Sequence, residues 1–206
     1  MEDVLDIYER PYNPEIPVIC MDEKPYQLLD EIIQPLPIKP GSVRKTDYEY
    51  VRKGTCSIFI FVEPLVGKRH AKALEQRTKI DFAHQVKEFV DTYYSEQEKV
   101  IFVLDNLNTH NSSSFYEAFD AETARRLSRK IEFHYTPKHG SWLNIAEIEL
   151  SVLSTQCIKM RIPSISALNS KLKAWATNRN LNSNKVDWQF TTDDARVKLK
   201  SLYPKF

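Results

Sequence analysis

Apolar residues form short runs and alternations along the chain that predict β-strands. The run 100–104 is wholly apolar, which is typical of a central strand covered on both faces. Residues 56–63 form a β-branched and aromatic run, and residues 69–77 could pair with it as a hairpin. A shorter run, 18–21, ends on an acid, and residues 131–136 alternate apolar and polar positions as a half-buried strand does.

Apolar positions at three- and four-residue steps predict the helices. One amphipathic helix is expected over residues 80–94, and a second at about 114–130. Further helices should begin at Asn144 and at Ser164, and Thr191 or Thr192 should cap a short last helix. The proline-rich stretch 34–41 and the asparagine-rich stretch 178–184 are expected to be loops.

Strands that alternate with helices after an initial hairpin indicate an α/β fold, with a mixed central sheet and helices on its faces. No linker is long enough to separate a second domain. We therefore expect one domain over residues 1–206, with a core at about 16–160 and a helical extension at about 161–206. The extension either packs on the main body or closes a lid, and the sequence does not choose between the two.

Composition narrows the class of protein further. The chain has 206 residues and 42% hydrophobic content, which is enough for one compact core. With only 4 glycines and no long apolar run, it is neither collagen-like nor membrane-spanning by composition. The segment 1–6 is acidic where a signal peptide is basic, so we expect a cytoplasmic protein. Cys20, Cys56 and Cys157 are scattered, which favours reduced thiols over a disulfide framework or a zinc site.

The formal net charge of +1 is not that of a dedicated DNA-binding module, but the charges are unevenly distributed. Residues 1–31 carry nine acids against two bases, whereas residues 38–79 carry ten bases against four acids. The second segment could form a local basic surface, although a solvated charged face is the commoner meaning of such a run.

Three carboxylates suggest a site for phosphoryl transfer. Asp22 and Asp105 end apolar runs, and Glu147 lies in the first turn of the helix expected after Asn144. In open α/β sheets, sites form where the carboxyl ends of neighbouring strands meet. Mg²⁺ prefers oxygen ligands, and a metal pair can clamp the attacking and the leaving oxygen of an in-line displacement. The set therefore points to a two-metal site.

Each acid also has a purely structural interpretation. Asp22 could simply end a strand. Glu147 lies three residues after Asn144, so the pair matches a capping box. Asp105 is harder to explain in this way, because a carboxylate at the rim of a buried sheet is costly to desolvate.

Three ordered motifs resemble the signatures of bacterial insertion-sequence transposases of the mariner-like DDE superfamily. They are Asp22-Glu-Lys24, Leu104-Asp-Asn-Leu-Asn-Thr-His110 and Tyr135-Thr-Pro-Lys-His-Gly-Ser-Trp-Leu-Asn-Ile-Ala-Glu147. With the closing segment 187–196, the similarity extends from about residue 16 to residue 204. The resemblance implies a ribonuclease H-like fold and a metal-binding, catalytic triad of Asp22, Asp105 and Glu147.

The same resemblance implies the chemistry, the cofactors and the partners. Two Mg²⁺ or Mn²⁺ ions would activate water to cut at a transposon end, and then orient the released 3′ hydroxyl for attack on target DNA. No covalent enzyme intermediate is needed. The partners would be transposon ends and target DNA, and a homodimer is expected by analogy because two ends must be joined.

Other motif residues could support this chemistry. Asn106 and His110 could hold a metal ligand or a phosphate, or they could be plain turn residues, whereas Asn144 caps the helix of Glu147. Trp142 is better explained as a core anchor than as a base-stacking platform. Candidate DNA contacts, each of which could equally be a solvated charge, are Arg44, Lys45, Arg52, Lys53, Lys138 and His139.

The chain departs from the family pattern at its start. The resemblance implies helix-turn-helix modules ahead of the first catalytic acid, but only about 20 residues precede Asp22 in this sequence. We therefore expect a catalytic region without its DNA-reading modules, which agrees with the near-neutral charge. Two alternatives stay open. One is an inactive or domesticated remnant that acts as a binding module, and the other is a metal-dependent nuclease or phosphohydrolase of the same fold.

Overall fold

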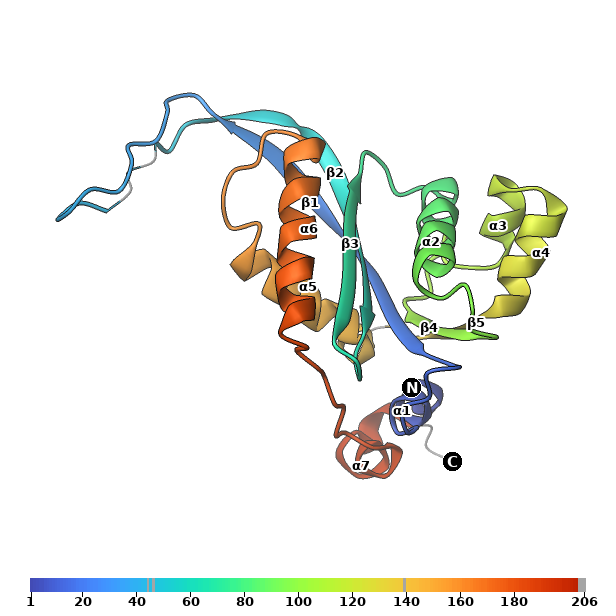
Figure 1. The fold of residues 1–206 in the computed structure, drawn as a ribbon. Helices are drawn as coiled ribbons and strands as arrows, with labels where there is room; N and C mark the ends of the chain where they lie inside the picture. Colours follow the sequence, from blue (N-terminus) through green and yellow to red (C-terminus); the bar gives the residue numbers. More distant parts are fainter. Residues whose placement is uncertain (44, 46, 139, 204–206) are drawn as a thin grey trace.

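A five-stranded mixed sheet is the framework of the molecule. The computed structural model describes residues 1–43, 45, 47–138 and 140–203 (Figure 1). The strand order is β3-β2-β1-β4-β5; β1 pairs with β2 and β2 with β3 antiparallel, whereas β1–β4 and β4–β5 are parallel. The bounds are β1 Val18–Glu31, β2 Tyr50–Glu63, β3 Lys68–Leu74, β4 Val100–Leu104 and β5 Ile131–Tyr135. The predicted α/β fold with a mixed sheet is confirmed.

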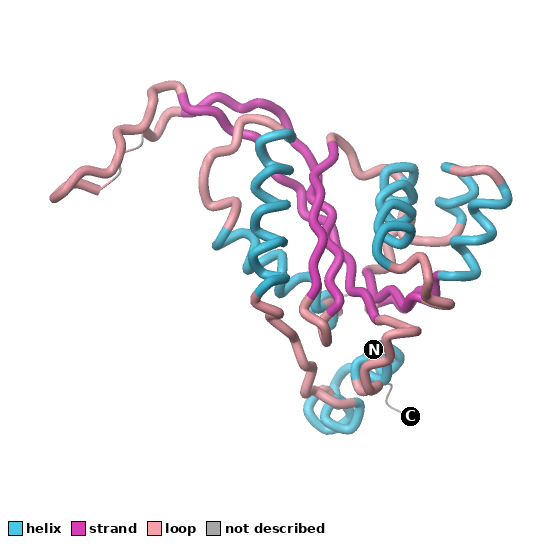
Figure 2. The backbone as a smooth tube through the Cα atoms, viewed as in Figure 1, coloured by secondary structure: helices cyan, strands magenta, loops and turns pink. Residues whose placement is uncertain are grey.

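Helices cover both faces of this sheet (Figure 2). One face packs on α2, α3 and α4 through a cluster rich in phenylalanine, and the other packs on α5 and α6. In β4, Phe102 joins the first cluster and Val103 the second, which is why the whole strand is apolar. The bounds are α1 Glu2–Tyr8, α2 Lys79–Tyr93, α3 Ser113–Ala118, α4 Ala121–Lys130, α5 Ile145–Gln156, α6 Ile165–Leu181 and α7 Thr192–Lys198, with 3₁₀ turns at Ser141–Leu143 and Lys200–Leu202.

Two predicted boundaries are wrong for identifiable reasons. The helix expected at about 114–130 divides in two, because the Asp120 carboxylate accepts the N–H of Thr123 at 2.9 Å and begins a new helix. The strand expected over residues 18–21 continues to Glu31, and β2 begins at Tyr50, six residues before the apolar run 56–63. The part of β1 beyond Leu28, residues 50–55 and the described residues between them form a hairpin that projects from the body and carries no apolar alternation, whereas Leu28 is still buried in the core (Figure 1).

The outer edge of β3 is covered by side-chain amides of α6. The Asn169 amide accepts the N–H of Ala73 at 2.7 Å and donates to its carbonyl at 3.0 Å. Asn180 forms the same pair of bonds with Arg69, at 2.8 and 3.0 Å. The two asparagines therefore occupy the positions of a sixth strand, and they satisfy backbone groups that an edge strand leaves open. The loop expected over residues 178–184 begins only after Leu181 for this reason.

The C-terminal segment packs on the body, which decides between the two arrangements left open above. The ring of Trp188 lies 5.4 Å from that of Tyr8 and 6.4 Å from that of Trp142. The Thr192 hydroxyl donates to Asp6 at 2.7 Å, and its N–H donates to Glu9 at 2.7 Å. α7 is therefore held against α1. Among the described helices, none combines the length and the apolar character that a membrane span requires.

Removal of one edge amide should destabilise the fold. We expect Asn180→Ala to lower the free energy of unfolding by about 1–3 kcal/mol, because the N–H and C=O of Arg69 lose their partners. Asn178→Ala is the matched control: Asn178 lies on the same helix but is exposed, so the change in helix propensity is the same. Urea unfolding of both variants measures the difference, and equal stabilities would contradict the role of the Asn180 amide.

Candidate active site

Two of the three predicted acids lie just beyond the last rung of the parallel β1–β4 ladder: Asp105 directly follows β4, whereas Asp22 lies within β1, which continues to Glu31. The β1–β4 register pairs Cys20 with Val103, so Asp22 and Asp105 each lie two residues beyond the same rung. Asp22 shares the sheet face of Cys20, because side chains alternate along a strand. That face is the one on which α5 packs. The parallel pairing thus brings together two acids that are 83 residues apart in the sequence.

Asn144 fixes the start of the helix that carries the third acid against the same strand. Its amide oxygen accepts the N–H of Ala146 at 3.1 Å and its amide nitrogen donates to the carbonyl of Met21 at 2.8 Å. The side chain is buried, and it joins the start of α5 to β1 at the residue before Asp22. Glu147 lies in the first turn of α5. Asn144 caps α5 without a reciprocal bond from Glu147, so the capping-box interpretation of Glu147 is wrong.

A buried ion cluster fixes the same helix further along. Glu149 is 1% exposed and accepts two bonds from Arg69, at 2.8 and 2.9 Å, and one from Arg179, at 2.9 Å. Arg69 lies on β3 and Arg179 on α6, so α5 is connected to both. Paired charges of this kind are costly to separate once they are buried. The orientation of α5, and of Glu147 on it, is therefore well determined.

The electrostatics of Asp22 show that the three acids interact. Burial raises the pKa of Asp22 to about 6; the N–H of Glu23, which donates to it at 2.7 Å, opposes the rise, and the charges of Asp105 and Glu147 add to it. Among the described side chains, no group of three His, Cys, Asp or Glu residues is close enough to hold a metal ion as it stands. The donor set itself, three carboxylates, is the kind that Mg²⁺ and Mn²⁺ prefer.

His110 lies between Asp105 and Glu23 and hydrogen-bonds to both carboxylates. Glu23 is a residue that the sequence interpretation missed. Its Nδ1 lies 2.6 Å from the carboxylate of Asp105, and its Nε2 lies 3.1 Å from that of Glu23. Burial alone would lower the pKa of His110, but the hydrogen bonds to Asp105 and Glu23 raise it to about 9. The buried ring therefore carries a positive charge between two carboxylates at neutral pH.

The remaining predicted residues are dispersed. Asn106 and Lys138 are exposed in the loops that follow β4 and β5, whereas Arg44 and His139 lie outside the described residues. Arg52 pairs with Leu29, seven residues beyond Asp22 along β1, which is roughly 23 Å. With Lys45 and Lys53, it belongs to the projecting hairpin and not to the neighbourhood of the acids.

Trp142 is neither a buried core anchor nor an isolated platform. Its ring is 40% exposed and stacks near Trp188, with Phe190 edge-on at 5.9 Å. The prediction of a core anchor is therefore only half right, because the residue packs within an aromatic cluster on the surface.

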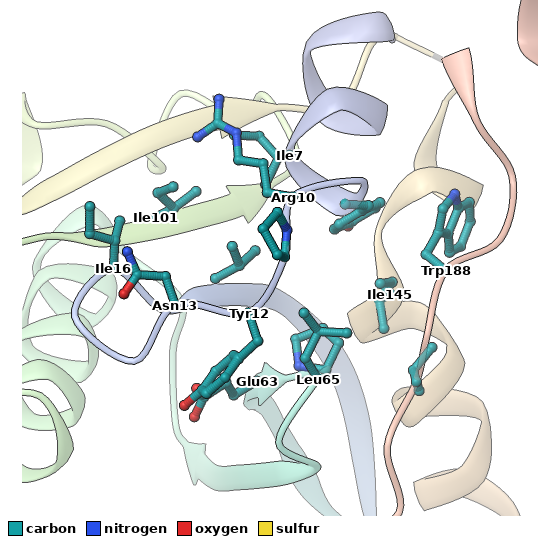
Figure 3. A pocket seen from close by; sticks show the side chains of 15 residues that line it. Ile7, Arg10, Tyr12, Asn13, Ile16, Glu63, Leu65, Ile101, Ile145 and Trp188 are labelled. Atoms are coloured by element: carbon teal, nitrogen blue, oxygen red, sulfur yellow. The ribbon is translucent and has the colours of Figure 1, made fainter. Parts of the chain in front are cut away.

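An apolar pocket of about 270 Å³ lies at the amino ends of β1 and β4 and reaches Ile145 at the start of α5 (Figure 3). Ile101, at the amino end of β4, and Trp188 contribute to its wall, and the buried carboxylate of Glu63 accepts the hydroxyl of Tyr94 at 2.8 Å beside it. It contains none of the three acids. The candidate site for chemistry is therefore formed by Asp22, Asp105 and Glu147, and not by this pocket.

Comparison with known proteins shows the family of the chain. The family described as DDE superfamily endonuclease matches residues 17–182, which include the three acids. No curated protein matches the chain in sequence.

Solved structures give the same fold. The crystal structure of the Mos1 mariner paired end complex with Mn is similar with a TM-score of 0.56 at 15% identity, over 88% of this chain and 55% of that one. The cryo-EM structure of the simian T-cell lymphotropic virus intasome with PP2A regulatory subunit B56 gamma is similar with a TM-score of 0.51 at 12% identity, over 79% and 50%. The chain spans about half the length of these matches. The expected ribonuclease H-like fold is confirmed.

The crowded carboxylates should cost stability. The raised pKa of Asp22 means that folding favours its protonated form, so this cost grows as the pH rises from about 4 to about 6 and is constant above. We expect Asp22→Asn to raise the free energy of unfolding by about 1–3 kcal/mol at pH 8 without metal, and the gain to vanish below pH 4. Thermal unfolding across this pH range measures it.

Asp30→Asn provides the matched control for this measurement. Asp30 lies on the same strand and accepts the N–H of Glu31 at 3.0 Å, much as Asp22 accepts that of Glu23, but it is 40% exposed and faces Lys53 at 3.5 Å. It should show no such gain. A less stable Asp22→Asn protein at pH 8 would contradict the electrostatic interaction of the three acids.

Proposed function

The chain belongs to the DDE superfamily endonucleases, and we propose that it is the catalytic domain of a DNA transposase. Asp22, Asp105 and Glu147 are the proposed catalytic acids and metal ligands. One observation carries this proposal: the β1–β4 pairing and the Asn144 bond bring together acids from three separate segments, beyond the last rung of the parallel β1–β4 ladder. Cleavage at transposon ends followed by strand transfer is the activity that we propose for this site.

Two Mg²⁺ or Mn²⁺ ions at this site would supply activation of the attacking oxygen and stabilisation of the leaving oxygen. The protein would contribute the ligands and their orientation. Asp22, Asp105 and Glu147 would each offer carboxylate oxygens, and repulsion among them would fall once cations were bound. His110 holds one carboxylate oxygen of Asp105, which leaves the other for a metal. Water would attack at the transposon end first, and the released 3′ hydroxyl would then attack the target phosphodiester.

The competing functions receive less support. A remnant that acts only as a binding module has no need of three neighbouring carboxylates, whereas here the charges of Asp105 and Glu147 add to the rise that burial causes in the pKa of Asp22. A nuclease of the same fold would use the same acids but would cut without joining. Buried, free Cys20, Cys56 and Cys157 fit a reducing compartment, and we infer the bacterial cytoplasm.

We further propose that two copies act together, since the joining of two transposon ends needs two active sites. The Mos1 structure is a paired end complex, which supports this arrangement. The projecting hairpin offers a contact surface, because it extends away from its own body (Figure 1). Its large apolar side chains are 53–84% exposed: Ile32, Ile33, Leu36, Ile38, Val43 and Tyr48. Exposed apolar groups of this number are typical of association sites.

Removal of the central acid should abolish the chemistry. We expect the chain to cut a plasmid that carries the element's inverted repeats in Mn²⁺ and not in EDTA. Asp105→Ala should lower the rate about 100-fold or more, because a lost ligand removes several kcal/mol of transition-state stabilisation. Gel analysis of cleaved and joined products measures both steps. Metal-dependent cutting by Asp105→Ala would contradict the assignment of Asp105 as a catalytic acid. Cutting without joining would favour the alternative of a nuclease of the same fold.

Polar substitution of the hairpin should weaken self-association. We expect the double change Leu36→Ser and Ile38→Ser to shift the complex of the protein with its end DNA from dimer toward monomer. Each serine removes apolar area that the proposed dimer interface would bury. The folded monomer should be unaffected, since both residues are exposed. Light scattering measures the mass, and Val197→Ser, an exposed apolar residue of α7, serves as control. A dimer of unchanged strength would assign the interface to another surface.

A further inference from the structure

Glu23 is a buried charge beside the candidate active site with no role assigned so far. It follows Asp22 on β1 but lies on the opposite sheet face, because side chains alternate along a strand. Its side chain is 3% exposed. A carboxylate is rarely buried so completely without partners that compensate its charge. The partners of Glu23 therefore indicate what it does.

Those partners lead directly to Asp105. One oxygen of Glu23 lies 3.1 Å from Nε2 of His110, and the other lies 4.0 Å from the guanidinium of Arg77. The opposite ring nitrogen of His110 lies 2.6 Å from Asp105. Glu23 and Asp105 are thus connected through one imidazole, although they lie on different strands and 82 residues apart.

The imidazole is held so that it cannot turn freely. The His110 ring is 1% exposed and lies 4.8 Å from the ring of Phe82. Its backbone carbonyl accepts the hydroxyl of Tyr135 at 2.8 Å, and its N–H donates to Leu107 at 3.0 Å. The ring orientation is therefore determined by packing and by the bond to Glu23.

Asp105 depends on this imidazole for its own orientation. The Asp105 side chain is 37% exposed and comes directly after β4, where the strand no longer constrains it. Within the described part of the chain, His110 is the hydrogen-bond partner of its carboxylate. For a half-exposed aspartate with one hydrogen-bond partner, that partner determines which rotamer the side chain adopts.

We propose that Glu23 is a positioning residue of the active site: through His110 it orients the carboxylate of Asp105 for a divalent cation. The inference rests on the proposed function, because it concerns the same metal site. Partners behind a metal ligand fix its orientation, and their loss typically costs 10- to 100-fold in metal affinity or activity. A second oxygen of Asp105 stays free for the cation, while Glu23 touches neither cation nor DNA.

The molecule contains a matched control for this arrangement. His134 also lies between two carboxylates, Asp3 at 2.8 Å and Glu132 at 3.0 Å. This second bridge joins β5 to α1 and contains none of the proposed ligands. Glu132→Ala therefore removes a carboxylate from a histidine bridge without altering the ligand set, whereas Glu23→Ala removes one that orients Asp105.

The test is direct Mn²⁺ binding, measured from the paramagnetic resonance signal of free Mn²⁺, together with cleavage kinetics. We expect Glu23→Ala to weaken Mn²⁺ binding about 10- to 100-fold and to raise by a similar factor the Mn²⁺ concentration for half-maximal cleavage. The KM for DNA should match that of the unsubstituted chain. Glu23→Gln should be intermediate, because its amide oxygen can still accept from Nε2. Glu132→Ala should leave both quantities unchanged.

Circular dichroism establishes that each variant is folded, and Glu23→Gln decides the question if Glu23→Ala does not fold. Mn²⁺ binding that is lost in Asp105→Ala but unchanged in the Glu23 variants would overturn the positioning role alone. Mn²⁺ binding that does not require Asp105 would overturn the proposed function, and the positioning role with it. Equal losses in Glu23→Ala and Glu132→Ala would mean a general effect on stability, which also contradicts the proposal.

Discussion

The parallel pairing of β1 with β4 is the constraint on which the candidate site depends. It aligns Asp22 with Asp105 just beyond the last rung of their parallel ladder, although neither residue is near the other in sequence. Asn144 extends the same alignment to α5 by one hydrogen bond to the backbone of β1. A slip of one residue in the pairing would move Asp22 relative to Asp105 and place its neighbours on the wrong face. The buried faces of β4 make such a slip costly.

The site is assembled against its own electrostatic repulsion. The apolar clusters on both sheet faces and the buried Arg69–Glu149 pair hold α5 and the strands in place, while burial and the charges of Asp105 and Glu147 disfavour the ionised form of Asp22. His110 offsets part of this repulsion by its position between Asp105 and Glu23. Active sites that bind cations commonly retain such strain, because the energy is recovered when the cation arrives.

The sequence predicted the parts of the structure that local rules determine. The strand 100–104, the helix expected over residues 80–94 and the cap at Asn144 follow from apolar pattern and hydrogen-bonding chemistry within a few residues. The extent of β1 could not be predicted, since charged and polar residues follow Met21 and the projecting hairpin beyond Leu28 has no buried face. The bridge from Glu23 to His110 was also missed, because it joins residues 87 positions apart and leaves no periodic signal. The only available signal was that Glu23 directly follows Asp22 of the first motif.

The amides of Asn169 and Asn180 have a consequence for how molecules of this kind meet one another. An exposed edge strand can recruit a strand from another chain, which is a common route to aggregation. Here a helix presents hydrogen-bonding groups to β3, so a foreign strand would have to displace both asparagines before it could add. Growth of the sheet beyond β3 is thereby blocked, and a protein that carries a long hairpin with exposed apolar residues keeps at least this edge closed to uncontrolled association.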